Sequence, residues 1–133
     1  MARENVEVVR RLNSAFNSGD IDAVLALVDP SFEAQVPAEF SPEPDIYRGH
    51  DGIRRYFDSF NDAMSEICFH QDGFREAGPS VVVEVRLTAK GRTTGIAVEQ
   101  RFAQVWTLRD RRAVEVRTYA SMPEALASVG LGA

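Results

Sequence analysis

The chain has 133 residues, 44% of them hydrophobic, and a formal net charge of -5 at pH 7, which is the size and composition of one globular domain. The acidic balance, with a pI near 5.0, argues against nucleic-acid or anionic-membrane partners, because these bind a concentrated positive surface. The start of the chain lacks the apolar core of a signal peptide and no apolar run approaches ~18 residues, so we expect a cytoplasmic protein without a membrane span.

Two helices are predicted at the start of the chain. Apolar side chains recur at helical spacing within residues 4–17, and Gly19 marks the end of this first helix. Its apolar positions are Val8, Val9, Leu12, Ala15 and Phe16. Asp20 can cap a second helix, whose apolar stripe runs to Val28 before Pro30 stops it.

A short strand, a loop and a third helix are predicted next. Phe32 to Val36 has a strand pattern, and the prolines at 37, 42 and 44 predict an irregular loop up to Tyr47, of the kind that lines the mouth of a cavity. The sequence Gly49-His50-Asp51-Gly52 precedes the third helix. The apolar face of that helix contains Ile53, Phe57, Phe60 and Met64.

The second half of the chain has the pattern of strands. They are predicted at Ile67–Phe74, Val81–Ala89, Val98–Leu108 and Val114–Tyr119. Ser121 as an N-cap, with Pro123 in the first turn, predicts a closing helix that ends at Gly130. Because short turns join these strands, we predict an α+β fold in which one curved antiparallel sheet wraps around the helices, with residues 1–133 as a single domain.

Several short motifs resemble those of a known family. They are Asn17-Ser18-Gly19-Asp20, Tyr47-Arg48-Gly49-His50-Asp51-Gly52-Ile53, Val105-Trp106-Thr107-Leu108-Arg109-Asp110, and Tyr119 followed by Glu124-Ala125-Leu126. With the order of the elements, they resemble the SnoaL-like branch of the nuclear transport factor 2-like (ketosteroid isomerase-like) superfamily, over nearly the whole chain. The resemblance implies a cone that encloses a deep pocket, usually in a homodimer.

The resemblance also disfavours two of the known activities of this superfamily. Ketosteroid isomerases use an aspartate base on the first strand and a tyrosine on the first helix, and these positions correspond to Val36 and Leu12 here. In limonene epoxide hydrolases, the position that corresponds to Thr118 holds the base. None of these three side chains is a general base, so both mechanisms are disfavoured and the catalytic residues, if any, are unknown.

Polar and aromatic residues are the candidates for the wall of the pocket. The polar candidates are Glu33, Gln35, Glu84, Arg86 and Thr118. The aromatic candidates are Phe16, Phe32, Tyr47, Tyr56, Phe60 and Trp106. Glu84 and Arg86 would orient a ligand if they faced the interior, each compensating the charge of the other. In the alternative, both lie on the solvent face of the sheet.

Histidine and cysteine residues give little sign of a metal or redox site. His50 is either an acid–base group or a structural residue at the start of a helix. Cys68 and His70 are two residues apart on a predicted strand, but two ligands do not make a metal site. The single cysteine excludes an internal disulfide. We therefore expect no metal and no other cofactor.

Three functions remain open. The first is a pocket protein that binds a small, largely apolar ligand, and the vacated catalytic positions favour it. The second is a cofactor-free isomerase, cyclase or hydrolase acting on a polyketide-, steroid- or terpenoid-like substrate. The third is a dimerisation or interaction module without a ligand. A homodimer through the outer face of the sheet is also predicted, because both faces of the strand at 98–108 are largely apolar or uncharged after Arg101 and one of them needs cover.

Overall fold

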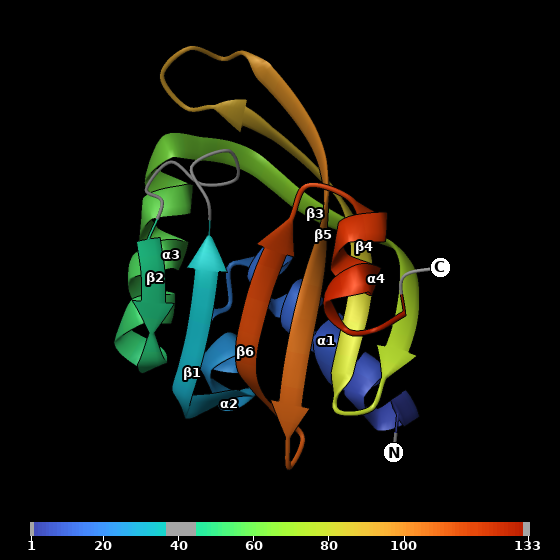
Figure 1. Ribbon diagram of the computed structural model, residues 1–133. Helices are drawn as coiled ribbons and strands as arrows, with labels where there is room; N and C mark the ends of the chain where they lie inside the picture. Colours follow the sequence, from blue (N-terminus) through green and yellow to red (C-terminus); the bar gives the residue numbers. More distant parts are fainter. Residues whose placement is uncertain (1, 37–44, 132–133) are drawn as a thin grey trace.

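The computed structural model describes residues 2–36 and 45–131. The elements in this part of the chain are α1 (Ala2–Ser18), α2 (Ile21–Ala26), β1 (Val28–Val36), β2 (Asp45–Arg48), α3 (Gly49–Ala63), β3 (Met64–Ala77), β4 (Ser80–Gly91), β5 (Ala97–Arg109), β6 (Arg112–Tyr119) and α4 (Met122–Ser128) (Figure 1). The predicted α+β class is confirmed. None of the helices in the described ranges is long and apolar enough to cross a membrane.

The strands form one six-stranded sheet in the order β2-β1-β6-β5-β4-β3. Neighbouring strands are antiparallel except β1 and β6, which run parallel. The prediction of a wholly antiparallel sheet is therefore corrected to a mixed sheet. The long connection from β1 to β6 explains the difference, because a tight turn forces antiparallel pairing whereas a crossover does not.

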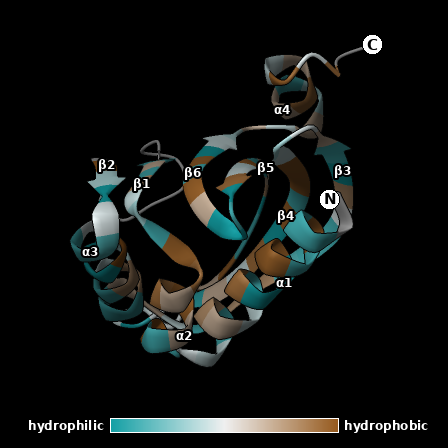
Figure 2. Cartoon of the chain, turned by 90° about the horizontal axis from the view of Figure 1, so that it is seen from below, coloured by the Kyte–Doolittle hydropathy of each residue, from teal (hydrophilic) through white to brown (hydrophobic). Residues whose placement is uncertain are grey.

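The sheet is bent, and helices cover both of its faces unequally. Helices α1, α2 and α3 lie against the concave face, and α4 lies on the convex face near the C-terminus (Figure 2). The larger core fills the concave side, where β4 contributes Val81, Val83, Val85 and Leu87. Val82 points the other way and packs in a smaller core with Ala103, Val105 and Ala125 of α4. The alternation of side chains along a strand produces this division.

The junction between α2 and β1 differs from the prediction. Helix α2 ends at Ala26, and β1 already begins at Val28, whose side chain is only 2% exposed. Pro30 lies inside the strand, where the register against β6 shifts between Val28 and Glu33. Such an irregularity accepts a residue without an N–H. Val28 therefore matches the spacing of the apolar residues of α2, although it belongs to β1 and not to the helix.

Strand β2 was not predicted from the sequence. Its four residues pair with the end of β1, with Tyr47 opposite Ala34. The predicted loop at 37–44 lies outside the described residues, whereas Tyr47, its predicted end, belongs to the strand. The remaining predicted strands are confirmed, each with longer bounds than the sequence pattern gave.

The last hairpin and the closing helix agree with the prediction. At the tip of the hairpin, Asp110 and Arg111 have φ values of 52° and 64°, as a two-residue type I′ turn requires. The Ser121 side chain accepts the N–H of Glu124 at 3.4 Å and caps α4. The chain therefore makes this turn without the glycine that such turns usually contain.

Helix α1 is held against the edge strand β3 by two asparagines. The Asn17 amide donates to the carbonyl of Phe69 at 3.0 Å, and its oxygen accepts the N–H of the same residue at 2.8 Å. One turn earlier, Asn13 donates to the same carbonyl at 2.9 Å. These bonds fix the position of α1, and so of the residues that α1 presents to the concave face.

The corner between α1 and α2 supports a first prediction. Gly19 has φ +76°, and the Asp20 carboxylate accepts the N–H of Ala23 at 3.1 Å. We expect Gly19→Val to lower the free energy of unfolding by about 1–2 kcal/mol, because a β-branched residue is strained in this conformation, and Asp20→Ala by about 1 kcal/mol through loss of the cap. Urea denaturation measures both. Unchanged midpoints in both variants would contradict this geometry.

Candidate ligand-binding cavity

A partly open cavity of ≈ 80 Å³ lies between the concave face of the sheet and helices α1 to α3. Most of its wall is apolar or aromatic. Polar side chains enter the wall at Asn13, Tyr56, Gln104 and Thr118. Among the described residues that line the cavity there is no carboxylate, imidazole, ammonium or guanidinium group. The described part of the wall is therefore uncharged.

Strand alternation brings the sheet residues of the cavity together. Gln104 and Trp106 are two residues apart on β5 and share its concave side. In the pairing of β5 with β6, Gln104 lies opposite Thr118 and Trp106 opposite Val116. The regular antiparallel register thus places an amide and a hydroxyl side by side in an otherwise apolar wall.

Trp106 is anchored within the cavity wall. Its indole Nε1 donates to Gln104 Oε1 at 3.0 Å. Its ring centroid lies 6.3 Å from that of Phe32 on β1. A buried indole needs a partner for its N–H, and Gln104 supplies it. This contact also determines which end of the Gln104 amide faces the indole.

Tyr56 brings a hydroxyl to the cavity from α3. Its ring contacts those of Tyr47, Phe60 and Phe16, with centroids 5.1, 5.6 and 5.9 Å away. Burial raises the pKa of the Tyr56 phenol well above its usual range, and Tyr47 adds a smaller contribution in the same direction. Tyr56 therefore stays protonated at physiological pH and can form neutral hydrogen bonds, but it cannot act as a base there.

Five of the predicted pocket residues line the cavity. They are Phe16, Phe32, Tyr56, Trp106 and Thr118. Tyr47 and Phe60 are 0% and 2% exposed and pack behind Tyr56. They support the cavity wall and are not among the described residues that form it. The aromatic candidates therefore lie in or directly behind the wall of this cavity.

The charged part of the prediction is wrong. Glu84 and Arg86 share the convex side of β4 with Val82, because the opposite row of β4 fills the core. Glu84 is exposed, and Arg86 lies 3.7 Å from Asp72 and 3.8 Å from Glu99. The solvent-face alternative is the correct one.

Glu33 and Gln35 also lie away from the cavity. They alternate with Phe32 and Ala34, which face the core. Glu33 accepts a hydrogen bond from Arg48 of β2 at 3.4 Å, and neither residue is among the described residues that line the cavity. Their spacing on one strand face was predicted correctly, but the face is the convex one.

The positions of the vacated catalytic residues can be compared with the cavity. Leu12 and Thr118 line it, so two positions to which the resemblance assigns proton-transferring groups hold an apolar side chain and a hydroxyl here. Val36 ends β1, and its side chain is outside the described part of the structure.

Asn13 and Gln104 are functional candidates that the sequence analysis missed. Both line the cavity. Gln104 could have been inferred from Trp106, because residues two apart on a strand share a face. Asn13 lies next to Leu12 and one helical turn before Phe16, at the border of the apolar stripe of α1. A polar residue at such a border does not by itself indicate a pocket.

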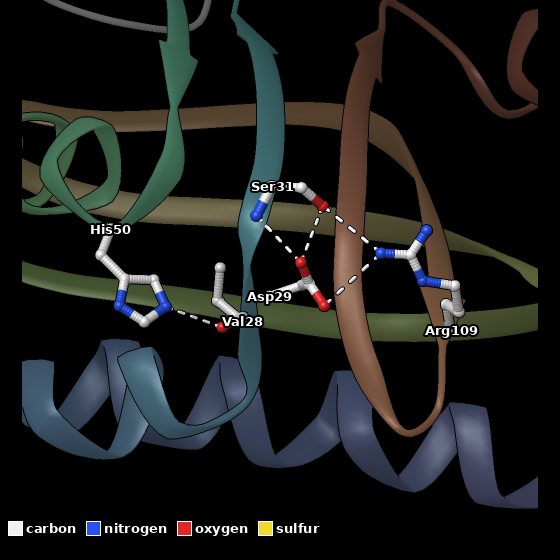
Figure 3. A network of polar contacts seen from close by, with 5 residues as sticks. All are labelled: Val28, Asp29, Ser31, His50 and Arg109. Atoms are coloured by element: carbon white, nitrogen blue, oxygen red, sulfur yellow. Dashed lines mark hydrogen bonds and ion pairs between the residues drawn. The ribbon is translucent and has the colours of Figure 1, made fainter.

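A polar network joins the start of β1 to α3 and β5 (Figure 3). The backbone N–H and hydroxyl of Ser31, together with Arg109, hold the pKa of the Asp29 carboxyl below its usual range. His50 Nε2 donates to the carbonyl of Val28 at 2.8 Å. His50 therefore has the structural role that was one of its two interpretations, and it anchors a strand residue that lines the cavity.

The remaining cysteine and histidine lie on β3. Cys68 Sγ is 3.9 Å from His70 Nδ1, and His70 Nε2 is 3.3 Å from the Thr88 hydroxyl. Within residues 2–36 and 45–131, no three His, Cys, Asp or Glu side chains gather as metal ligands would.

The apolar convex surface of β5 is covered within the chain itself. Ala103 and Val105 pack with Val82 of β4 and Ala125 of α4. The sequence argument for a homodimer required this surface to be covered by a second copy, and α4 meets that requirement instead. The homodimer stays a prediction that rests on the family resemblance.

Comparisons with known proteins agree with the fold. A nuclear transport factor 2-like (NTF2-like) protein of unknown function from Burkholderia pseudomallei has a TM-score of 0.79 and 24% identity, over 96% of this chain and 98% of that one. A protein from Jannaschia sp., provisionally described as a SnoaL-like polyketide cyclase, has a TM-score of 0.78 and 17% identity, over 96% and 92%.

A third solved structure contains a small molecule. It is a hypothetical protein with a ketosteroid isomerase-like fold from Catenulispora acidiphila, in complex with trimethylamine, with a TM-score of 0.77 and 16% identity over 94% of this chain and 93% of that one. A comparison with curated sequences gave no significant match. The SnoaL-like domain model matches residues 9–116. Since this match extends over most of the sequence and the fold agrees with it, the chain belongs to the SnoaL-like domain family.

Proposed function

We propose that this protein binds a small, largely apolar molecule in the cavity between its sheet and helices α1 to α3. The observation that carries the proposal is an apolar and aromatic wall in which a few polar side chains converge, which is the usual composition of a small-molecule site. The solved relative in complex with trimethylamine supports the use of this fold to hold a small compound.

The uncharged wall favours binding over acid–base catalysis. A proton-transferring enzyme needs a group that changes protonation near neutral pH, and the described lining residues supply none. Tyr56 is the one phenol among them, and its raised pKa keeps it protonated. With the described lining residues, a cyclase or isomerase activity, as suggested by the relative from Jannaschia sp., would proceed by positioning and hydrogen bonding.

The volume limits the size of the enclosed group. An apolar cavity of roughly 150 Å³ holds benzene, and this cavity measures ≈ 80 Å³. The ligand is therefore either a compound of about one ring, bound with a small outward movement of the wall, or a larger compound that inserts one end. The partly open shape of the cavity is compatible with both.

The tryptophan provides a direct test. The chain contains one tryptophan, so the indole N–H gives a single NMR signal that reports on the cavity wall. We expect toluene to shift this signal with saturation in the wild-type protein. We expect Ala34→Leu, which fills the cavity from β1, to weaken toluene binding at least about 10-fold, since the larger side chain competes for the same space.

The matched control is Ala97→Leu, the same substitution at an exposed position of β5, which should bind toluene as the wild type does. A wild-type indole signal that toluene leaves unmoved would count against the proposal. Equal affinity in Ala34→Leu and the wild type would place the binding site elsewhere.

A further inference from the structure

The hydrogen bonds of Asn13 settle which atom of its carboxamide is available to a ligand. The side chain is bonded to the carbonyl of Phe69 at 2.9 Å. A carbonyl oxygen only accepts hydrogen bonds, so the atom that faces it must be the nitrogen. In the described part of the chain, no hydrogen bond is found to Asn13 Oδ1. Since Asn13 lines the cavity, α1 offers a hydrogen-bond acceptor there.

The Gln104 carboxamide is oriented the other way round, with its oxygen bonded and its nitrogen available. Its partner is the indole Nε1 of Trp106 at 3.0 Å. An indole N–H only donates, so the atom that faces it must be Gln104 Oε1. The amide nitrogen of Gln104 has no hydrogen-bond partner among the described residues, and Gln104 also lines the cavity. Strand β5 therefore offers a hydrogen-bond donor.

Solvent accessibility supports the availability of these atoms. No side-chain nitrogen or oxygen that is fully buried lacks a partner within the described ranges. Asn13 and Gln104 are both only half-buried, so their unbonded amide atoms retain accessible surface. The hydroxyls of Tyr56 and Thr118 can donate or accept, and they complete a polar set that carries no charge.

We propose that the cavity selects neutral molecules that carry both a carbonyl acceptor and an N–H or O–H donor on an apolar frame, with the carbonyl bound by Gln104 and the donor by Asn13. A primary carboxamide is the simplest group that meets both requirements. A carboxylate of the same shape would lack the donor and would bring an uncompensated charge to a wall whose described residues carry none. This inference rests on the proposed function of the cavity.

The wild-type protein tests the inference with four compounds of nearly the same size and shape: benzamide, acetophenone, benzoate and α-methylstyrene. Benzamide has the acceptor and the donor, acetophenone only the acceptor, benzoate a charge, and α-methylstyrene no strong polar group. Titration of the Trp106 indole signal gives the dissociation constants. We expect benzamide to bind most tightly, about 10-fold more tightly than benzoate and α-methylstyrene, with acetophenone between them.

Two nearly isosteric variants assign the two contacts. Gln104→Met removes the donor, and we expect it to weaken benzamide and acetophenone alike by several-fold. Asn13→Leu removes the acceptor, and we expect it to weaken benzamide more than acetophenone. Asn17 still bonds the Phe69 carbonyl in this second variant, which limits the structural damage. If either variant does not fold, the four affinities of the wild-type protein decide the question alone.

The outcomes separate this inference from the proposed function. If α-methylstyrene binds as tightly as benzamide, or if benzoate binds most tightly, the cavity is a binding site but the selectivity proposed here is wrong. If none of the four compounds binds, the proposed function fails and the inference fails with it.

Discussion

Replacing Phe32 by alanine is expected to lower the free energy of unfolding by about 3–5 kcal/mol. The ring is 1% exposed and packs in the larger core. It contacts Trp106 on the same, concave face of the sheet. Phe32 also lines the existing cavity, so its removal enlarges a space that the surrounding structure already fails to close. The cost therefore includes a cavity term in addition to the lost transfer free energy. Urea denaturation followed by circular dichroism measures it.

The matched comparison is Phe32→Leu, which keeps most of the apolar volume and should cost at most about half as much. A loss below about 1 kcal/mol in Phe32→Ala would mean that neighbouring side chains collapse into the space, which contradicts the packing described for this wall.

Gly52→Ala is expected to destabilise the protein by about 1–3 kcal/mol. Gly52 is buried in the first turn of α3, and a Cβ there would lie 2.8 Å from the carbonyl carbon of Tyr47 and 3.2 Å from its Cα. These are backbone atoms of β2 and cannot rotate away, so the helix or the strand must shift. Alanine in place of glycine ordinarily stabilises a helix by about 0.5–1 kcal/mol. A loss of stability in Gly52→Ala would therefore show that the steric conflict with β2 outweighs the ordinary gain from alanine in a helix.

Gly73→Ala serves as the control, because a Cβ at Gly73 on β3 would meet nothing within 4 Å. Thermal and urea denaturation of both variants gives the comparison. A stabilised Gly52→Ala variant would show that α3 and β2 are not in close contact, and that Tyr47 is not fixed behind Tyr56 in the way described above.

The predictable part of the fold is the part specified by local chemistry. The corner at Gly19 and Asp20 and the cap at Ser121 each follow from one or two neighbouring residues. The start of β1 and the whole of β2 were not predicted, because β2 has only four residues and pairs with residues of β1 that lie 9 to 15 positions away in the sequence. Pro30 also argued against a strand, and only the register shift beside it explains its place.

The candidate site was less predictable than the fold. Both rows of side chains on β4 have apolar members, since Val82 packs under α4 while Val83 packs under α1 to α3. The pattern alone therefore could not decide which face Glu84 and Arg86 share. Which amide atoms of the cavity stay available to a ligand depends on two hydrogen bonds, that of Asn13 to the Phe69 carbonyl and that of Gln104 to the Trp106 indole. The orientation of each amide follows from a tertiary contact and so could not be predicted from the sequence.

The two hydrogen bonds of Asn17 have a consequence for the behaviour of the protein at high concentration. Strand β3 lies at the edge of the sheet, where free backbone groups can recruit a strand from another molecule. At Phe69, the side chain of Asn17 occupies both the N–H and the carbonyl in the way that a neighbouring strand would. Two register shifts along the same strand further disturb its regular edge. In this way, one asparagine on a helix protects the middle of an edge strand from aggregation.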